Sequence, residues 1–393
     1  MTRKFDVVVL GAGAAGMMCA IRAGRRGRSV LVLDHAKAPG EKIRISGGGR
    51  CNFTNIHASA KNFLSANPHF AKSALARYTP RDFLDMVEAH GIAWHEKTLG
   101  QLFCDESAKD IIHMLLSEMK AANVVLELQQ QITSIEKRFD GFRIATSGGP
   151  VEAQSLVVAT GGKSIPKMGA TGFAYDIAKQ FGLKIVETRP ALVPLTLDPN
   201  LLEKLSVLSG IGVPAEVRHG KTVFREALLF THRGLSGPAI LQISSYWREG
   251  DDITLTIEPD LEIAVRLKSA RKTNGRQAAQ TLLAEILPRR LVQFFVESRG
   301  IAAHLADLSD KAIEGLASSI QNWTIRPAGS EGYRTAEATL GGIDTSGLDS
   351  KTMQAKAVPG LYFIGECVDV TGWLGGYNFQ WAWASGHVCG ENL

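Results

Sequence analysis

The sequence predicts an α/β fold in which a parallel β-sheet is joined to a β-rich segment and a helical segment. Residues 5–10 form an apolar, β-branched strand that runs directly into a glycine-rich turn and an apolar helix. Residues 154–162 form a similar apolar strand that ends in two glycines. Residues 360–369 form another, which is followed by a glycine and an acidic residue. After Pro190 the pattern changes to short strands with polar turns, and from about residue 261 it becomes helical. Continuous apolar runs are typical of buried parallel strands, so we expect both ends of the chain to converge on one sheet.

Composition excludes several classes of protein. With 45% hydrophobic and 21% charged residues, the chain of 393 residues is neither disordered nor collagen-like, and its length predicts two or three domains. The five cysteines are widely spread and lack metal-ligand spacing, which favours a reducing compartment and no metal site. The basic start and the uncharged residues 7–21 resemble a signal peptide, but glycines interrupt that run. We expect a soluble, cytoplasmic protein without a membrane span.

The glycine-rich turn has the spacing that binds a dinucleotide. It reads GAGAAG over residues 11–16, and a second strand at residues 29–33 ends in Asp34. In this motif Gly11 makes the tight turn, Gly13 lets the backbone approach a pyrophosphate, and Gly16 lets the helix pack on the strand. The helix N-terminus favours the phosphate charge, and we expect Asp34 to bind a ribose hydroxyl.

Two later segments favour FAD over NAD as the dinucleotide. Residues 154–162 form a strand ending in a glycine pair, which closes over the cofactor in flavoproteins with two dinucleotide-binding domains. Residues 360–369 form a strand followed by glycine and an acid, the arrangement that holds the ribityl chain and pyrophosphate of FAD. A glycine-rich loop at residues 372–378 then opens the last helix. An NAD dehydrogenase has no need of that distant strand, so we expect FAD.

Three segments of the chain resemble one family of flavoproteins. They are GEKIRISGGGRCNFTN at residues 40–55, FTHRGLSGPAILQIS at residues 230–244, and residues 339–386, which include GWLGGYNFQWAW. Through these motifs the chain is similar over its whole length to the HI0933-like (BaiN/RdsA) flavoproteins. Members are described as a ribosomal-RNA dihydrouridine synthase, which this chain resembles most, an aminoacetone oxidase and a bile-acid enone reductase. The resemblance implies fold and FAD more firmly than substrate, since one fold hosts different chemistries.

The resemblance also implies how the domains are arranged. A Rossmann-like FAD-binding domain of the two-dinucleotide-domain type is expected at residues 1–190 and 334–393. A β-rich substrate domain at residues 191–260 and 323–333 and a basic helical subdomain at residues 261–322 are inserted into it. The expected FAD-binding residues are Gly11, Gly13, Ala14, Ala15, Gly16, Asp34, His35, Lys42, Gly49, Arg50, Asn52, Ile132, Thr160, Gly161, Gly365, Glu366, Gly376, Tyr377 and Asn378. Of these, Lys42 and Arg50 would hold the pyrophosphate or the flavin pyrimidine edge, and Asn52 that edge or a substrate carbonyl.

Reducing uridine to dihydrouridine places definite demands on the site. Hydride adds at C6 and a proton at C5, while negative charge builds on the C4 oxygen, so an acid and oxyanion donors are needed. The candidate acids are Cys51, His232 and Tyr377. The alternative for Cys51 is a small thiol packed under the glycine loop, and the alternative for His232 and Arg233 is that they fix their own loop. Trp373 and Tyr377 are expected to stack on flavin or on a base.

Basic residues concentrate in the predicted helical segment. The net charge is +5, from 44 basic and 39 acidic residues, and residues 262–299 alone hold eight basic and three acidic ones, a difference of five. Phosphate contacts supply much of the affinity for nucleic acid, so we expect this segment to bind RNA, which the resemblance identifies as 23S rRNA or its assembly precursor. The alternative is an ordinary solvated helix surface. Expected substrate contacts are Trp373, Arg233, Arg271, Lys272, Arg276, Arg289 and Arg290.

The number of GxGxxG motifs bears on how the electron donor binds. Only one full GxGxxG is present, whereas a glutathione-reductase-like enzyme carries a second, so NAD(P)H is expected to visit the flavin transiently. We therefore expect an FAD-dependent reductase that forms dihydrouridine in large-subunit rRNA. Rival hypotheses are a flavin oxidase of a small amine such as aminoacetone, a reductase of a small enone, and a non-enzymatic FAD protein that senses redox state through Cys51. The sequence leaves the oligomeric state open.

Overall fold

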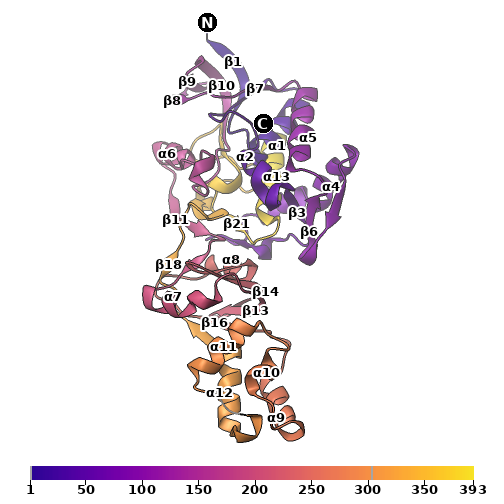
Figure 1. The fold of residues 1–393 in the computed structure, drawn as a ribbon. Coiled ribbons are helices and arrows are strands. Elements are labelled where there is room, and N and C mark those ends of the chain that lie inside the picture. The colour runs from indigo at the N-terminus through magenta and orange to yellow at the C-terminus, as the bar shows by residue number, and fades with distance from the viewer. Residues whose placement is uncertain (1, 302–303) are drawn as a thin grey trace. The chain divides into compact units, whose positions relative to one another are not determined.

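The computed structural model describes residues 2–301 and 304–393, which form two compact units. The first unit is made of Met1–Pro190 and Glu337–Leu393, and the second of Ala191–Ala336. In Figure 1 the indigo N-terminal segment and the yellow C-terminal segment lie together in the first unit. The expected division of the insertion at residue 260 into a β-rich and a helical domain stays a prediction.

The first unit is built on a mixed sheet with strand order β7-β2-β1-β10-β9-β8. β1 (Arg3–Leu10) pairs in parallel with both β2 (Val30–Leu33) and β10 (Gly149–Val158). β20 (Leu361–Phe363) also pairs in parallel with β10, so a strand from the C-terminal segment joins the sheet that the N-terminal segment begins. This convergence of the two ends, together with the Rossmann-type order, confirms the predicted fold class.

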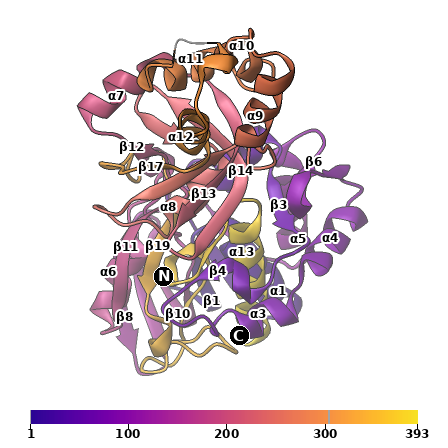
Figure 2. The ribbon, with the colours of Figure 1, turned by 90° about the horizontal axis from the view of Figure 1, so that it is seen from below.

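The last helix of the chain packs on the first. α1 (Ala14–Arg25) and α13 (Tyr377–Glu391) lie side by side in Figures 1 and 2. A Cβ on Gly386 would stand 2.4 Å from the Ala15 carbonyl oxygen, so only glycine permits this crossing. Trp381 and Trp383 of α13 are fully buried, as expected for core residues. The crossing brings the C-terminal glycine loop into the same unit as the GAGAAG turn.

The remaining elements of the first unit complete the sheet edges and cover its faces. β7 lies at one edge in parallel with β2, and β8 and β9 form an antiparallel hairpin that turns near residue 140. The bounds of these three strands and of the other remaining elements are β7 Val125–Glu127, β8 Ile132–Arg138, β9 Gly141–Thr146, β3 Asn52–Asn55, β4 Phe63–Leu64, β5 Trp94–Glu96, β6 Gln101–Cys104, β11 Ile185–Ala191, β19 Ala338–Ile343, β21 Thr371–Gly372, α2 Glu41–Ile45, α3 Lys72–Arg77, α4 Pro80–Ala89, α5 Ala108–Ala121 and α6 Phe173–Gln180.

The second unit combines a largely antiparallel sheet with a group of helices. Its strand order is β17-β16-β13-β14-β15-β12-β18. In Figure 2 the helices α9 to α12 gather at one end of this unit. The bounds are β12 Leu195–Thr196, β13 Gly212–His219, β14 Thr222–Thr231, β15 Gly234–Ser236, β16 Ile253–Ile257, β17 Trp323–Ile325, β18 Gly329–Ser330, α7 Pro199–Leu205, α8 Pro238–Ser244, α9 Ile263–Thr273, α10 Ala279–Leu283, α11 Arg289–Ser298 and α12 Asp310–Gln321.

Candidate functional site

The three glycines of the GAGAAG turn differ in what surrounds them. Gly11 has φ +107° and its Cβ would stand 2.5 Å from the Ala159 carbonyl oxygen, while a Cβ on Gly16 would stand 1.9 Å from the Gly11 oxygen. The fold itself therefore requires both. A Cβ on Gly13 would meet nothing within 4 Å, although Gly13 directly precedes α1. This open approach to the N-terminus of a 12-residue helix fits a phosphate group, because the first N–H groups of a helix have no intrahelical acceptor.

Asp34 anchors this turn from the end of β2. Its Oδ2 accepts from the Ala12 N–H at 2.6 Å and its Oδ1 from the Ala36 N–H at 2.8 Å. A carboxylate offers about four lone-pair sites, so capacity remains for the expected ribose hydroxyl. Two other expected FAD-binding residues differ in exposure. His35 is exposed, and its Nδ1 lies 3.4 Å from Asp34 Oδ1. Ile132 is half-buried at the start of β8. Asp34 thus shapes the phosphate turn in addition to any contact with ligand.

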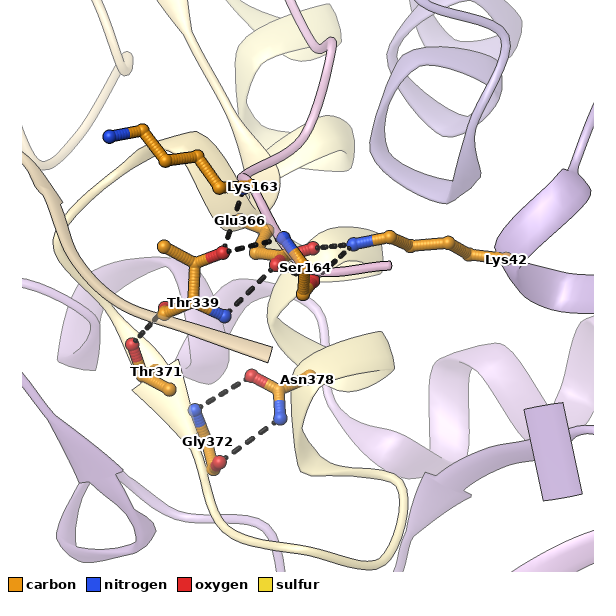
Figure 3. Close-up of polar contacts among 8 residues, drawn as sticks. All are labelled: Lys42, Lys163, Ser164, Thr339, Glu366, Thr371, Gly372 and Asn378. Atoms are coloured by element: carbon orange, nitrogen blue, oxygen red, sulfur yellow. Dashed lines mark hydrogen bonds and ion pairs between the residues drawn. The ribbon is translucent and has the colours of Figure 1, made fainter. Parts of the chain in front are cut away.

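A partly buried carboxylate lies at the centre of a polar network (Figure 3). The Lys42 ammonium donates to Glu366 Oε2 and to the Ser164 hydroxyl, both at 2.6 Å. Glu366 Oε1 accepts from the Ser164 hydroxyl at 2.6 Å and from the Thr339 N–H at 3.0 Å. Burial by itself raises the pKa of Glu366, but the Lys42 charge and these hydrogen bonds outweigh it and lower the pKa. Glu366 is therefore an anion near neutral pH, held in one orientation.

The strand end at residues 158–164 is fastened beside this network. The Thr339 hydroxyl accepts from the Lys163 N–H at 2.9 Å and the Ser164 N–H at 3.1 Å (Figure 3). Gly161 has φ +74° and faces Glu366, and a Cβ on Gly162 would stand 2.4 Å from Thr339 Oγ1. The buried hydroxyl of Thr160 has no hydrogen-bond partner among the described residues. Because buried hydroxyls are rarely left unpaired, this orphan fits a bound ligand with polar groups, such as FAD.

The C-terminal glycine loop is held closed by Asn378. Its side chain accepts from the Gly372 N–H at 2.8 Å and donates to the Gly372 carbonyl at 3.0 Å (Figure 3). The Tyr377 ring is only 7% exposed and packs edge-on against Phe63, and Trp373 lies edge-on to Tyr377 at 6.2 Å. Tyr377 is thus mainly a packing residue of the loop, whereas the half-buried Trp373 remains accessible for stacking.

The SGGGRCN segment provides an open glycine surface beside an exposed cation. Gly48 and Gly49 have φ +67° and +88°, and a Cβ on either would meet nothing within 4 Å. Arg50 is exposed. Asn52, in contrast, is turned into the protein, where its Nδ2 donates to the Thr54 carbonyl at 3.1 Å and its Oδ1 accepts from the Gly376 N–H at 3.3 Å. Asn52 therefore ties β3 to the C-terminal loop, which leaves its carboxamide little capacity for substrate.

Cys51 is fully buried, with 0% exposure. Burial raises its pKa far above the usual thiol range, although a hydrogen bond with Ser46 opposes that shift. Its backbone has φ +48°, the left-handed region that few non-glycine residues adopt. The side chain belongs to the buried hydrophobic core of the first unit. The burial favours the alternative of a packed thiol over that of a proton donor or an exposed redox sensor.

His232 and Arg233 lie in the second unit, on the turn between β14 and β15. Both side chains are exposed, and Arg233 is 3.6 Å from Glu331. The Thr231 hydroxyl accepts from the N–H groups of Arg233 and Gly234, so the turn is held by its own hydrogen bonds. The backbone of the loop is therefore held without either side chain, which leaves His232 available for a substrate, while Arg233 is paired with Glu331.

The basic residues of the helical segment fall into two groups. Arg271 donates to the Leu308 carbonyl and pairs with Asp310, and Arg290 donates to the Val207 carbonyl at 3.0 Å. Both are engaged within the protein. Arg276 and Arg289 are exposed and have no hydrogen bond or ion pair in the part of the chain that the structure describes, and Lys272 is exposed too. The second group has charge available for RNA phosphates.

Sequence reasoning missed two polar residues of the site, which are Ser164 and Thr339. Ser164 lies two residues after a predicted glycine pair, so the position of that pair was a usable signal. Within residues 2–301 and 304–393 there is no group of three or more metal-ligating side chains. Over the same residues none of the helices combines the length and apolarity needed to cross a membrane.

Comparison with known proteins agrees with this geometry. The family model described as "HI0933-like protein Rossmann domain" matches residues 5–392. The chain is 52% identical to "Ribosomal RNA dihydrouridine synthase" of Escherichia coli, over 99% of this chain and 98% of that protein. It is 44% identical to the protein of the same name from Haemophilus influenzae, over 100% and 99%. A solved 3-ketosteroid-Δ4-(5α)-dehydrogenase from Rhodococcus jostii shares the fold, with a TM-score of 0.52, 15% identity and coverage of 99% and 96%.

Proposed function

Because the chain belongs to the HI0933-like family, we propose that it is an FAD-dependent oxidoreductase that reduces a uridine of 23S rRNA to dihydrouridine, with NAD(P)H as the reductant. The observation that carries the proposal is similarity over nearly the full length to two relatives that bear the name ribosomal RNA dihydrouridine synthase. Because the chain is 52% identical to the Escherichia coli protein over nearly its full length, we expect the two proteins to share the substrate pocket as well as the fold.

The residues present fit FAD. Gly13 leaves room for a pyrophosphate at the start of α1, and Asp34 has lone pairs left for a ribose hydroxyl. The orphan hydroxyl of Thr160 and the oriented carboxylate of Glu366 offer an acceptor-rich surface for a ribityl chain. When bound and reduced, FAD supplies hydride. We propose that Lys42, which shares its charge with Glu366, keeps that part of the site close to neutral.

Proton delivery must come from the chain or from solvent, since reduction of the C5=C6 bond adds hydride at C6 and a proton at C5. The three candidate donors differ in access. Cys51 is fully buried and Tyr377 nearly so, whereas His232 is exposed on its turn. We propose His232 as the donor, because its imidazole is exposed and an imidazole N–H can act as a general acid.

RNA recognition is proposed to begin with charge. Lys272, Arg276 and Arg289 have exposed side chains on the helical segment, and Arg233 adds another beside His232. Phosphate contacts of this kind position an RNA without reading its sequence. The target base must also leave its stack, at a cost of a few kcal/mol, and an aromatic such as Trp373 offsets part of that cost by stacking.

The test is mass spectrometry of nucleosides from digested 23S rRNA of a strain that lacks this protein. We expect one dihydrouridine to disappear and to return when the wild-type gene is supplied, and purified FAD-loaded protein with NADPH to restore it on the extracted rRNA. A Lys37→Ala variant, altered at an exposed surface lysine, serves as a matched control. Unchanged dihydrouridine in the deletion strain would refute the proposal, and amine-dependent release of peroxide would favour the oxidase instead.

A further inference from the structure

The hairpin formed by β5 and β6 ends in a turn that carries an exposed leucine. The two strands are antiparallel, with Glu96 opposite Leu102, and the Lys97 N–H donates to the Gln101 carbonyl at 2.8 Å where the turn begins. Leu99 stands at the tip of this turn and is 59% exposed. Because so much of its surface stays in contact with water, its side chain contributes little to the core of the unit.

The backbone of this turn does not favour leucine. Leu99 has φ +60° and Gly100 has φ +75°, so both central residues of the turn are left-handed. A hairpin turn of this kind prefers asparagine followed by glycine, because the left-handed region brings Cβ close to the following carbonyl oxygen. Gly100 satisfies that preference and Leu99 contradicts it. Such a departure from local preference is expected where a side chain is used for binding.

The tip of the hairpin is fastened to the C-terminal glycine loop. The buried Asn55 donates through Nδ2 to the Leu99 carbonyl at 3.1 Å and to the Gly375 carbonyl at 2.9 Å. Gly375 belongs to the loop at residues 372–378, which is expected to contact FAD and whose Trp373 is proposed to stack on the target base. The exposed leucine is therefore held in a fixed position beside this loop.

The surroundings of the tip suit a nucleic acid. Ile56 is 43% exposed and lies against the turn, since a Cβ on Gly100 would stand 2.8 Å from its Cγ1. Lys97 is exposed, and its ammonium lies 5.2 Å from the centre of the Phe103 ring. The acidic neighbour, Glu96, has its side chain on the opposite face of the hairpin from Phe103, because side chains alternate along a strand. An apolar tip with a cation beside it matches the base faces and the phosphates of RNA.

We propose that Leu99 inserts into the base stack of the RNA in place of the extruded uridine. The inference rests on the proposed function, because a uridine within structured RNA must leave its stack before it can be reduced. Apolar side chains such as leucine and isoleucine act as wedges between base steps in other nucleic-acid complexes. By filling the gap, Leu99 slows the return of the uridine to the stack while its base is held at the site.

Kinetics on two RNA substrates test this role. Leu99→Asn suits the left-handed turn and removes the apolar side chain, so the variant should unfold at the same urea concentration as wild type or a higher one and should bind FAD equally. On folded 23S rRNA from the deletion strain we expect it to lower kcat/KM about tenfold. On a short single-stranded oligoribonucleotide with the sequence around the modified uridine, where little stacking must be broken, the loss should be less than about twofold.

Two further variants serve as controls. Leu99→Met keeps an apolar side chain and should retain most of the activity on folded rRNA. Phe139→Ala removes a fully exposed apolar side chain from the turn between β8 and β9 and should behave as wild type. The inference is overturned if Leu99→Asn matches wild type on folded rRNA, as it would if the tip contacted another protein, or if the variant loses equally on both RNAs. A wild-type protein that reduces neither RNA would instead remove the proposed function, and this role with it.

Discussion

Replacing Lys42 with methionine tests whether Glu366 is held as an anion by its partners. The variant removes the ammonium that stands 2.6 Å from Glu366 Oε2 while keeping an unbranched side chain of similar length. Glu366 then keeps only the Ser164 and Thr339 hydrogen bonds and remains largely shielded from water, with 19% of its side chain exposed. Breaking a fully buried pair costs about 3–5 kcal/mol, but Lys42 is 32% exposed, so we expect a loss of about 2 kcal/mol in unfolding free energy near pH 7.5.

The pH dependence gives this prediction its sign. In wild type the lowered pKa of Glu366 contributes stability above the ordinary carboxyl pKa, and that stability is lost as pH falls through the folded-state pKa. In Lys42→Met, burial is opposed only by two hydrogen bonds, so the pKa of Glu366 rises. The variant is then destabilised while the carboxyl is ionised and recovers as it protonates. The stability gap between the two proteins should therefore shrink from about pH 8 to about pH 5.

Urea unfolding of both proteins with saturating FAD measures that gap. A Lys37→Met variant, changed at an exposed lysine, controls for the loss of one positive charge. A gap that is constant with pH, or no gap at pH 7.5, would refute the view that Lys42 compensates a buried anion.

Three further outcomes follow from the glycine turn, the buried thiols and the basic surface. Gly13→Ala should leave the unfolding free energy of FAD-free protein nearly unchanged but weaken FAD binding at least tenfold in a fluorescence titration, whereas Gly16→Ala, which would clash at 1.9 Å, should destabilise the fold by about 3 kcal/mol or more. All five cysteines are buried and Cys51 has a raised pKa, so native protein should react with a thiol reagent far more slowly than unfolded protein, and rapid labelling of Cys51 would contradict this. Arg276→Ala should reduce the slope of log K for RNA against log salt by about 0.7–0.9, while Arg271→Ala, whose guanidinium is paired with Asp310 and the Leu308 carbonyl, should leave the slope unchanged.

Local patterns predicted the parts of the site that depend on short stretches of chain. The run from β1 through the glycine turn to α1 is such a case, because burial on both faces, tight turning and helix initiation are all specified by adjacent residues. The roles of Gly11 and Gly16 in packing follow from the same spacing. The family resemblance supplied Lys42 and Glu366, but composition and periodicity by themselves did not pair them.

Long-range contacts account for what could not be predicted. The network around Glu366 joins residues 42, 164, 339 and 366, and no local pattern reports that a serine and a backbone N–H from two other segments will meet there. Arg271 and Arg290 stay predicted RNA contacts, but their hydrogen bonds to the carbonyls of Leu308 and Val207 join distant segments and could not be predicted from local patterns. The carboxamides of Asn52 and Gln101 lie 2.9 Å apart although the two residues are 49 positions apart in the sequence, and no motif links them.

Because α13 packs on α1, the packing of α1 is completed only after the C-terminal segment has been synthesised. During synthesis the helix α1 leaves the ribosome well before α13, with Met18 and Ile21 among the apolar residues that are fully covered in the folded molecule. A Cβ on Gly386 would approach Met18 closely, so α13 supplies part of that cover, and it is translated some 350 residues later. The nascent chain therefore exposes the apolar face of α1 until α13 has been synthesised. We expect a chaperone to bind near α1 during that time.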